Sequence, residues 1–287
     1  MDPKELSHLR FEETFQGGHA GVFFSVSRVL FSEQTPFQRI DILQTPYLGR
    51  VFALDGITQT VDAFEFMYHE MLVHVALFAH PCPRKVLVIG GGDGGTLREV
   101  LKHPSVQEAW LVEIDEKVVQ AAREWLPKLS SSFSDPRSKI LFRDGAQLVG
   151  EFPNTFDAIL IDSTDPTAGE GGTLFTPEFY KNCLQALTPQ GFLVAQTEDP
   201  VFDRSWLEMA FSRIHSVFPQ TMLYTGFSPQ YPSGFWTYTI ASKQLDPRQI
   251  RSNVSAAHMK LQYYNPALHL ASFCLPTFLQ QILEKLR

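Results

Sequence analysis

The sequence predicts an α/β protein in which a small antiparallel β domain precedes a larger domain with a mostly parallel sheet and helices on both faces. Short, alternating apolar segments fill roughly the first sixty residues. Later apolar runs alternate with segments of helical period, as in a parallel sheet with helical crossovers. A glycine-rich turn follows the apolar run Val86–Ile89. We therefore expect an N-terminal β domain over residues 1–63 and a Rossmann-like domain over residues 64–287.

The first domain is predicted from its turns and its alternation. Pairs such as Asp55-Gly56 separate short segments whose apolar and polar residues alternate, which is typical of strands with one buried face. From Phe64 to Ala79 the period becomes helical, and Pro81 ends that helix. The expected strands are Val22–Phe31, Phe37–Leu43, Arg50–Leu54 and Thr58–Val61.

The second domain is predicted to continue with strands separated by helices. Two of its strands lie close together near the C-terminus and should form an antiparallel hairpin at the edge of the sheet. The remaining strands should be parallel to Val86–Ile89. After that first strand and the one ending at Glu113, the expected strands are Ile140–Arg143, Ala158–Ile161, Phe192–Gln196, Met222–Thr225 and Trp236–Ala241.

The glycine-rich turn predicts a nucleoside site. Five of the six residues from Gly90 to Gly95 are glycine, so a ligand can approach the backbone closely. Thr96–Lys102 should be the helix that follows. Glu113 ends the next strand a little over twenty residues later, where a carboxylate can accept hydrogen bonds from ribose hydroxyls. Asp93 within the turn disfavours a dinucleotide, because its carboxylate would face the pyrophosphate.

Acidic residues recur where strands are expected to end. A single one is better explained by a helix cap or a turn. Together, at one edge of a parallel sheet, they would repel one another unless a cation lies among them. The spacing lacks the histidines and close acids of a metal site, so we predict no metal and an organic polyamine cation. The acids are Asp93, Glu113, Asp144, Asp162, Asp165 and Glu198.

Aromatic residues in the same segments would suit such a cation. Tyr68, Tyr231 and Trp236 can line methylene groups and attract ammonium groups through their ring faces, although each taken alone is better explained by packing. The net charge of −7 over 287 residues disfavours nucleic acid as a partner. Three widely spaced cysteines predict reduced core thiols, and no apolar run reaches membrane-spanning length. A cytoplasmic protein is therefore expected.

The chain resembles the spermidine synthase family, the polyamine aminopropyltransferases, from about Phe37 to Pro276. Seven short motifs carry this resemblance. They are Tyr68-His69-Glu70, Gly90-Gly-Gly-Asp93-Gly-Gly, Val112-Glu113-Ile-Asp115, Asp144-Gly145, Asp162-Ser-Thr-Asp165-Pro166, Tyr231-Pro-Ser-Gly234 and Tyr263-Tyr264-Asn265.

The resemblance implies transfer of a 3-aminopropyl group from decarboxylated S-adenosylmethionine to a diamine, most often putrescine. The donor is a co-substrate, so no separate cofactor is expected. Asp162 would be the base, assisted by Tyr68. Residues implied in donor binding are Gln38, Gln59, Asp93, Glu113, Asp144 and Gly145; those implied in acceptor binding are His69, Asp93, Asp162, Asp165, Glu198 and Tyr231.

Two segments depart from the family pattern near the implied acceptor channel. The loop Thr167–Thr173 is one residue longer and lacks a proline, and Phe227–Gln230 replaces a commoner Ile-Pro-Thr. Putrescine leads as acceptor, with agmatine, cadaverine and spermidine as alternatives. A methyltransferase and a non-catalytic polyamine-binding protein remain alternative functions. The N-terminal β domain resembles the family's oligomerisation element, which implies a homodimer or a homotetramer.

Overall fold

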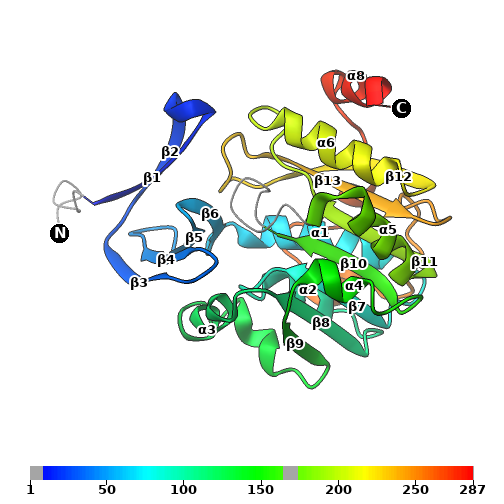
Figure 1. Cartoon of the computed structure of the whole chain (residues 1–287), viewed down its shortest axis with the longest axis horizontal. Coiled ribbons are helices and arrows are strands. Elements are labelled where there is room, and N and C mark those ends of the chain that lie inside the picture. The colour runs from blue at the N-terminus through cyan, green and yellow to red at the C-terminus, as the bar shows by residue number, and fades with distance from the viewer. Residues whose placement is uncertain (1–8, 164–173, 287) are drawn as a thin grey trace.

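The computed structural model describes residues 9–163 and 174–286. A seven-stranded sheet forms the centre of its larger domain, and the N-terminal strands lie to one side of it (Figure 1). The strand order is β12-β13-β11-β10-β7-β8-β9, and β7 to β11 run parallel. β13 pairs antiparallel with both β11 and β12, which confirms the predicted hairpin edge. The bounds are β7 Lys85–Gly90, β8 Glu108–Glu113, β9 Ser138–Phe142, β10 Phe156–Asp162, β11 Leu187–Gln196, β12 Gln220–Phe227 and β13 Phe235–Ser242.

Two small antiparallel sheets precede this domain. One contains β1 and β2, and the other has the order β3-β4-β5-β6. The predicted strand Val22–Phe31 is wrong, because the chain leaves the first sheet at Val26 and enters the second at Arg28. β1 was not predicted, since its side chains alternate only between exposed and half-buried. The bounds are β1 Arg10–Phe15, β2 Ala20–Ser25, β3 Arg28–Gln34, β4 Arg39–Gln44, β5 Arg50–Leu54 and β6 Ile57–Val61.

Helices cover both faces of the central sheet (Figure 1). On β7, Val86 and Val88 pack with α1 and α2, whereas Leu87 and Ile89 pack with α4 and α5. A strand buried on both faces explains the continuous apolar run in the sequence. The bounds are α1 Glu65–Ala79, α2 Gly95–Leu101, α3 Glu116–Trp125, α4 Gly145–Val149, α5 Pro177–Ala186, α6 Arg204–His215, α7 Pro266–Ala271 and α8 Thr277–Leu286.

Glu70 on α1 joins two of the sequence motifs. Its fully buried carboxylate accepts backbone hydrogen bonds of 2.8 Å from Gln262, Tyr263 and Tyr264. The ring of Tyr264 stacks on Phe78 of the same helix at 5.1 Å. The C-terminal segment is thereby held against the helix that carries Tyr68 and His69 into the site.

The three cysteines are free, as predicted. Only Cys183 is buried, so the predicted core location is wrong for Cys82 and Cys274, which lie on exposed turns beside prolines or helix ends. Among the helices in the described part of the chain, none is long and apolar enough to cross a membrane.

Candidate active site

A cavity of about 560 Å³ opens at the carboxyl ends of the parallel strands. Its volume is within the range of small-molecule sites. The turn after β7, the ends of β8 and β10, α1 and β6 all contribute to its wall. The tip of the β1–β2 hairpin closes another side, where Gln16 donates a 2.6 Å hydrogen bond to the backbone oxygen of Phe202. The site is therefore built from both the N-terminal strands and the Rossmann-like domain.

Asp162 ends β10 and lines this cavity. Tyr68 donates a 2.7 Å hydrogen bond to its Oδ1, and Thr96 donates one of 2.6 Å to its Oδ2. Burial, and then the charge of Asp162, raise the pKa of Tyr68 well above its usual value. Tyr68 therefore stays a hydroxyl donor at neutral pH. A carboxylate has about four acceptor positions, so both oxygens can still accept a proton from an amine.

Thr96 was not among the predicted site residues. It occupies the first turn of α2, directly after the glycine-rich turn, and is fully buried. Gly91 brings the two segments together by donating a 2.7 Å backbone hydrogen bond to the carbonyl of Asp162. A hydroxyl residue immediately after Gly94-Gly95 was the available sequence signal, but hydroxyls are common in first helical turns for other reasons.

His69 and Asp93 meet beside Asp162. The Nε2 atom of His69 lies 3.7 Å from Oδ1 of Asp93, and its Nδ1 lies 2.7 Å from Oε2 of Glu65. Burial opposes a charge on His69, but the hydrogen bond with Glu65 and the surrounding carboxylates outweigh it and raise its pKa to about 9. Burial raises the pKa of Asp93, while the charge of His69 lowers it. The two groups therefore stabilise each other's charged forms.

The predicted nucleoside end is assembled at β8 and α4. Glu113 lies on the cavity wall, and its Oε1 accepts a 3.0 Å hydrogen bond from the backbone of Asp115. Burial raises the pKa of Glu113 to about 7. Asp144 and Gly145 line the same cavity at the start of α4. This part of the wall offers acceptors for hydroxyl and amino groups.

Gln38 and Gln59 both line the cavity from the N-terminal strands. Gln38 donates a 3.3 Å hydrogen bond to Asp115 at the start of α3, so it links the two parts of the chain. The backbone oxygen of Gln59 accepts a 3.0 Å hydrogen bond from the hydroxyl of Tyr231. The structure thus brings every predicted donor-binding residue to one cavity.

The predicted acceptor end has an aromatic wall and a buried acid. Tyr231 stacks on Trp236 with ring centroids 4.0 Å apart, and the edge of Tyr68 approaches both rings. Glu198 is buried and accepts a 2.9 Å hydrogen bond from Gln196. Asp165 and the loop Thr167–Thr173 lie outside the described residues.

One cation could contact three of these side chains together. Single ligand atoms of His69, Asp93 and Asp162 lie within 4.8 Å of one another. The Nδ1 atom of His69 contacts Glu65, and a ring whose pKa is about 9 is mostly the doubly protonated cation at neutral pH. A metal ion bound there would have to displace the Nε2 proton, whereas the two carboxylates can accept hydrogen bonds from an ammonium group directly.

Two family models match the chain. Residues 65–253 match a spermine/spermidine synthase domain, and residues 11–62 match a spermidine synthase tetramerisation domain. The polyamine aminopropyltransferases of Thermotoga neapolitana and Thermotoga maritima are each 53% identical over 283 residues, which covers 98% of this chain and 95% of each relative.

Two solved structures are similar to this chain over nearly its whole length. A spermidine synthase in complex with the transition-state analogue AdoDATO is 51% identical, with a TM-score of 0.92 and 98% of both chains covered. The Thermotoga maritima spermidine synthase is 50% identical, with a TM-score of 0.90 over 98% of this chain and 97% of that one.

The fold and the cavity are those of a group-transferring enzyme with a methyltransferase-like sheet. The chain belongs to the spermine/spermidine synthase family, the polyamine aminopropyltransferases. This membership sets aside the methyltransferase and the non-catalytic binding protein as alternatives.

Proposed function

We propose that this enzyme transfers a 3-aminopropyl group from decarboxylated S-adenosylmethionine to putrescine, giving spermidine and 5′-methylthioadenosine. The supporting observation is the position of Asp162, which lines the same cavity as Glu113 and Tyr231 and accepts hydrogen bonds from Tyr68 and Thr96. An amine held there can reach the donor while a carboxylate accepts its proton.

The reaction needs alignment and removal of one proton. The acceptor nitrogen attacks the propyl carbon bonded to the sulfonium, a carbon–nitrogen bond forms, and the carbon–sulfur electron pair returns to sulfur as a neutral thioether. Asp162 would accept the proton that the attacking nitrogen loses. The sulfonium is already activated, so we propose that the donor is a co-substrate and that no separate cofactor takes part. Holding the two reactants in line then accounts for much of the rate.

The remaining roles follow the walls of the cavity. Glu113 would hold the ribose, and Asp144 with Gly145 the adenine, with Gln38 and Gln59 enclosing the nucleoside. Asp93 would bind the amine of the aminopropyl arm. We propose that the acceptor channel is lined by His69, Glu198, Tyr231 and Asp165.

The proposed function is tested by release of methylthioadenosine from decarboxylated S-adenosylmethionine. Putrescine, agmatine, cadaverine and spermidine would be supplied separately at equal concentration. We expect the highest kcat/KM with putrescine. If another of these amines gave the highest kcat/KM, aminopropyl transfer would be supported and that amine would be the preferred acceptor. If no amine led to release, the proposal would be contradicted.

Gly95 supports this site by making room for His69. A Cβ atom at Gly95 would lie 2.2 Å from the buried imidazole ring, so the ring or the backbone would have to shift. We expect Gly95→Ala to lower kcat/KM on the order of 10²-fold, because displacement of a positioning group by about 1 Å can cost that much. Gly150→Ala is the matched control, since its Cβ would have no neighbour nearer than 3.6 Å. If both variants were equally active in the release assay, the position of His69 would not matter for the reaction.

We also propose that the N-terminal sheets mediate assembly into a homo-oligomer, a dimer or a tetramer. Tyr47 and Phe23 in these sheets are 82% and 56% exposed, and both line a second, apolar hollow. The family model matched there is a tetramerisation domain. Sedimentation of the purified chain should give a mass of at least twice 32.5 kDa, and a monomer at micromolar concentration would contradict this.

A further inference from the structure

His69 is a fully buried base surrounded by acids. On its own helix, Glu65 contacts Nδ1, and the ring of Tyr68 lies edge-on to the imidazole with ring centroids 5.3 Å apart. From the turn after β7, Asp93 faces Nε2 at 3.7 Å. From the end of β10, Asp162 faces the same ring and adds to its negative surroundings. The ring thus faces two carboxylates on which the proposed function depends.

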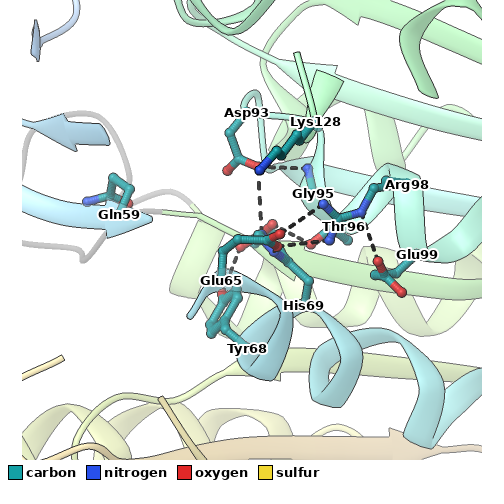
Figure 2. A network of polar contacts seen from close by, with 12 residues as sticks. Gln59, Glu65, Tyr68, His69, Asp93, Gly95, Thr96, Arg98, Glu99 and Lys128 are labelled. Carbon is teal, nitrogen blue, oxygen red and sulfur yellow. Dashed lines mark hydrogen bonds and ion pairs between the residues drawn. The ribbon is translucent and has the colours of Figure 1, made fainter. Parts of the chain in front are cut away.

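Arg98 fixes the charge and the position of Glu65. It donates hydrogen bonds of 2.9 and 2.8 Å to the two oxygens of Glu65, and its Nε lies 2.9 Å from Glu99 (Figure 2). Burial disfavours a charged Glu65, but His69 and Arg98 outweigh it and lower its pKa to about 2. Glu65 is therefore a permanent acceptor for Nδ1–H, and the other nitrogen of His69 must face Asp93.

The protonation of Nε2 decides whether this contact attracts or repels. If Nε2 carried a lone pair, it would face the carboxylate of Asp93 across 3.7 Å with no donor between them. Among the described residues, Nε2 has no hydrogen-bond partner and is shielded from solvent. A proton on Nε2 instead places a cation between Asp93 and Asp162, whose like charges would otherwise be uncompensated in a buried cleft.

We propose that His69, positioned by Glu65 and Arg98, is the resident cation of the empty site and gives up its Nε2 proton when the ammonium group of the donor binds beside Asp93. The proton passes to solvent. The neutral Nε2 then accepts a hydrogen bond from the same ammonium, which would satisfy this buried atom. The identity of the incoming ammonium rests on the proposed function, but the charge of His69 in the free enzyme does not.

Calorimetry with two nucleosides tests the exchange. The first probe is 5′-deoxy-5′-(3-aminopropylthio)adenosine, which carries the ammonium, and the second is 5′-methylthioadenosine, which lacks it. Titrations at pH 8 in buffers of different ionisation enthalpy give the number of protons released. We expect close to one proton for the first probe and close to none for the second. Equal release for both probes, or no release for the first, would overturn the proposal.

The source of the proton is tested by Glu65→Gln. Without the Glu65 charge, His69 should be largely neutral at pH 8, so proton release with the first probe should fall severalfold while affinity for methylthioadenosine stays the same. Glu124→Gln, an exposed change on α3, should keep the wild-type count. Undiminished release from Glu65→Gln would mean that Asp93 supplies the proton and would contradict the role of His69.

A second measurement needs neither a ligand nor a variant. In nitrogen-15 spectra of histidine-labelled, ligand-free enzyme, the His69 imidazole should titrate above pH 8, well above an ordinary histidine. A value near 6.5 would overturn the proposal even if aminopropyl transfer were demonstrated. A value above 8 in a protein that fails to transfer aminopropyl groups would leave His69 as the resident cation and contradict only the proposed function.

Discussion

Replacing Asp162 with asparagine is expected to lower kcat by roughly 10²-fold or more, in line with the usual contribution of a general base. The amide cannot accept the proton of the attacking amine. Its shape is nearly that of the carboxylate, so the hydrogen bonds with Tyr68 and Thr96 can be partly kept. The nucleoside wall around Glu113 is untouched, and affinity for methylthioadenosine should change little.

The same substitution at the other end of β10 provides the control. Asp157 accepts backbone hydrogen bonds of 2.8 and 3.1 Å from Arg84 and Lys85, away from the cavity. Asp157→Asn should therefore lower thermal stability somewhat and leave kcat near the wild-type value. Single-turnover rates separate chemistry from product release. If Asp162→Asn reacted as fast as the wild type in a single turnover, the base would have to be another group.

Tyr68 and Thr96 differ in how far the sequence could identify them. Tyr68 belongs to a motif that resembles the family, and the structure places its hydroxyl on Asp162. Thr96 lies on the same carboxylate at 2.6 Å, yet it is 66 residues away in sequence. A contact between the first turn of one helix and the end of a later strand depends on the sheet order, which local patterns do not encode.

The N-terminal region shows a similar limit. The four-stranded sheet follows from alternation and turns, and three of its predicted strands are confirmed with small shifts in their ends. The β1–β2 hairpin was not predicted, because β1 lacks a fully buried face and β2 was merged with β3 into one strand. Residues at its tip nevertheless line the cavity. Hydrophobic periodicity reports burial within one chain, and an exposed hairpin that closes a site gives little of that signal.

The buried charges around His69 could also not be predicted from the sequence. Glu65 precedes His69 by one helical turn, a spacing that is common on solvated helix faces. The structure shows instead that both are buried and that Arg98 comes from another helix to bind Glu65. Charged residues with helical spacing are usually exposed, so only the packing of α1 against α2 reveals a charged network behind the site.

Replacing Asp93 with asparagine is expected to weaken the preference for decarboxylated over intact S-adenosylmethionine by about 10²-fold. The carboxylate of Asp93 lies on the cavity wall, fixed by a 2.7 Å hydrogen bond from the backbone of Gly95. Intact S-adenosylmethionine carries a second carboxylate where the decarboxylated donor has hydrogen. Facing like charges cost several kcal/mol, and about 1.4 kcal/mol corresponds to a factor of ten in affinity.

Asparagine would remove this repulsion and also the attraction to the donor ammonium, so the two affinities should converge from opposite directions. The measurement is the ratio of dissociation constants for the two nucleosides. Asp144→Asn is the comparison, because a change at the proposed adenine-binding end of the cavity should weaken both nucleosides alike and leave their ratio unchanged. A ratio in Asp93→Asn as large as in the wild type would show that shape, and not charge, excludes intact S-adenosylmethionine.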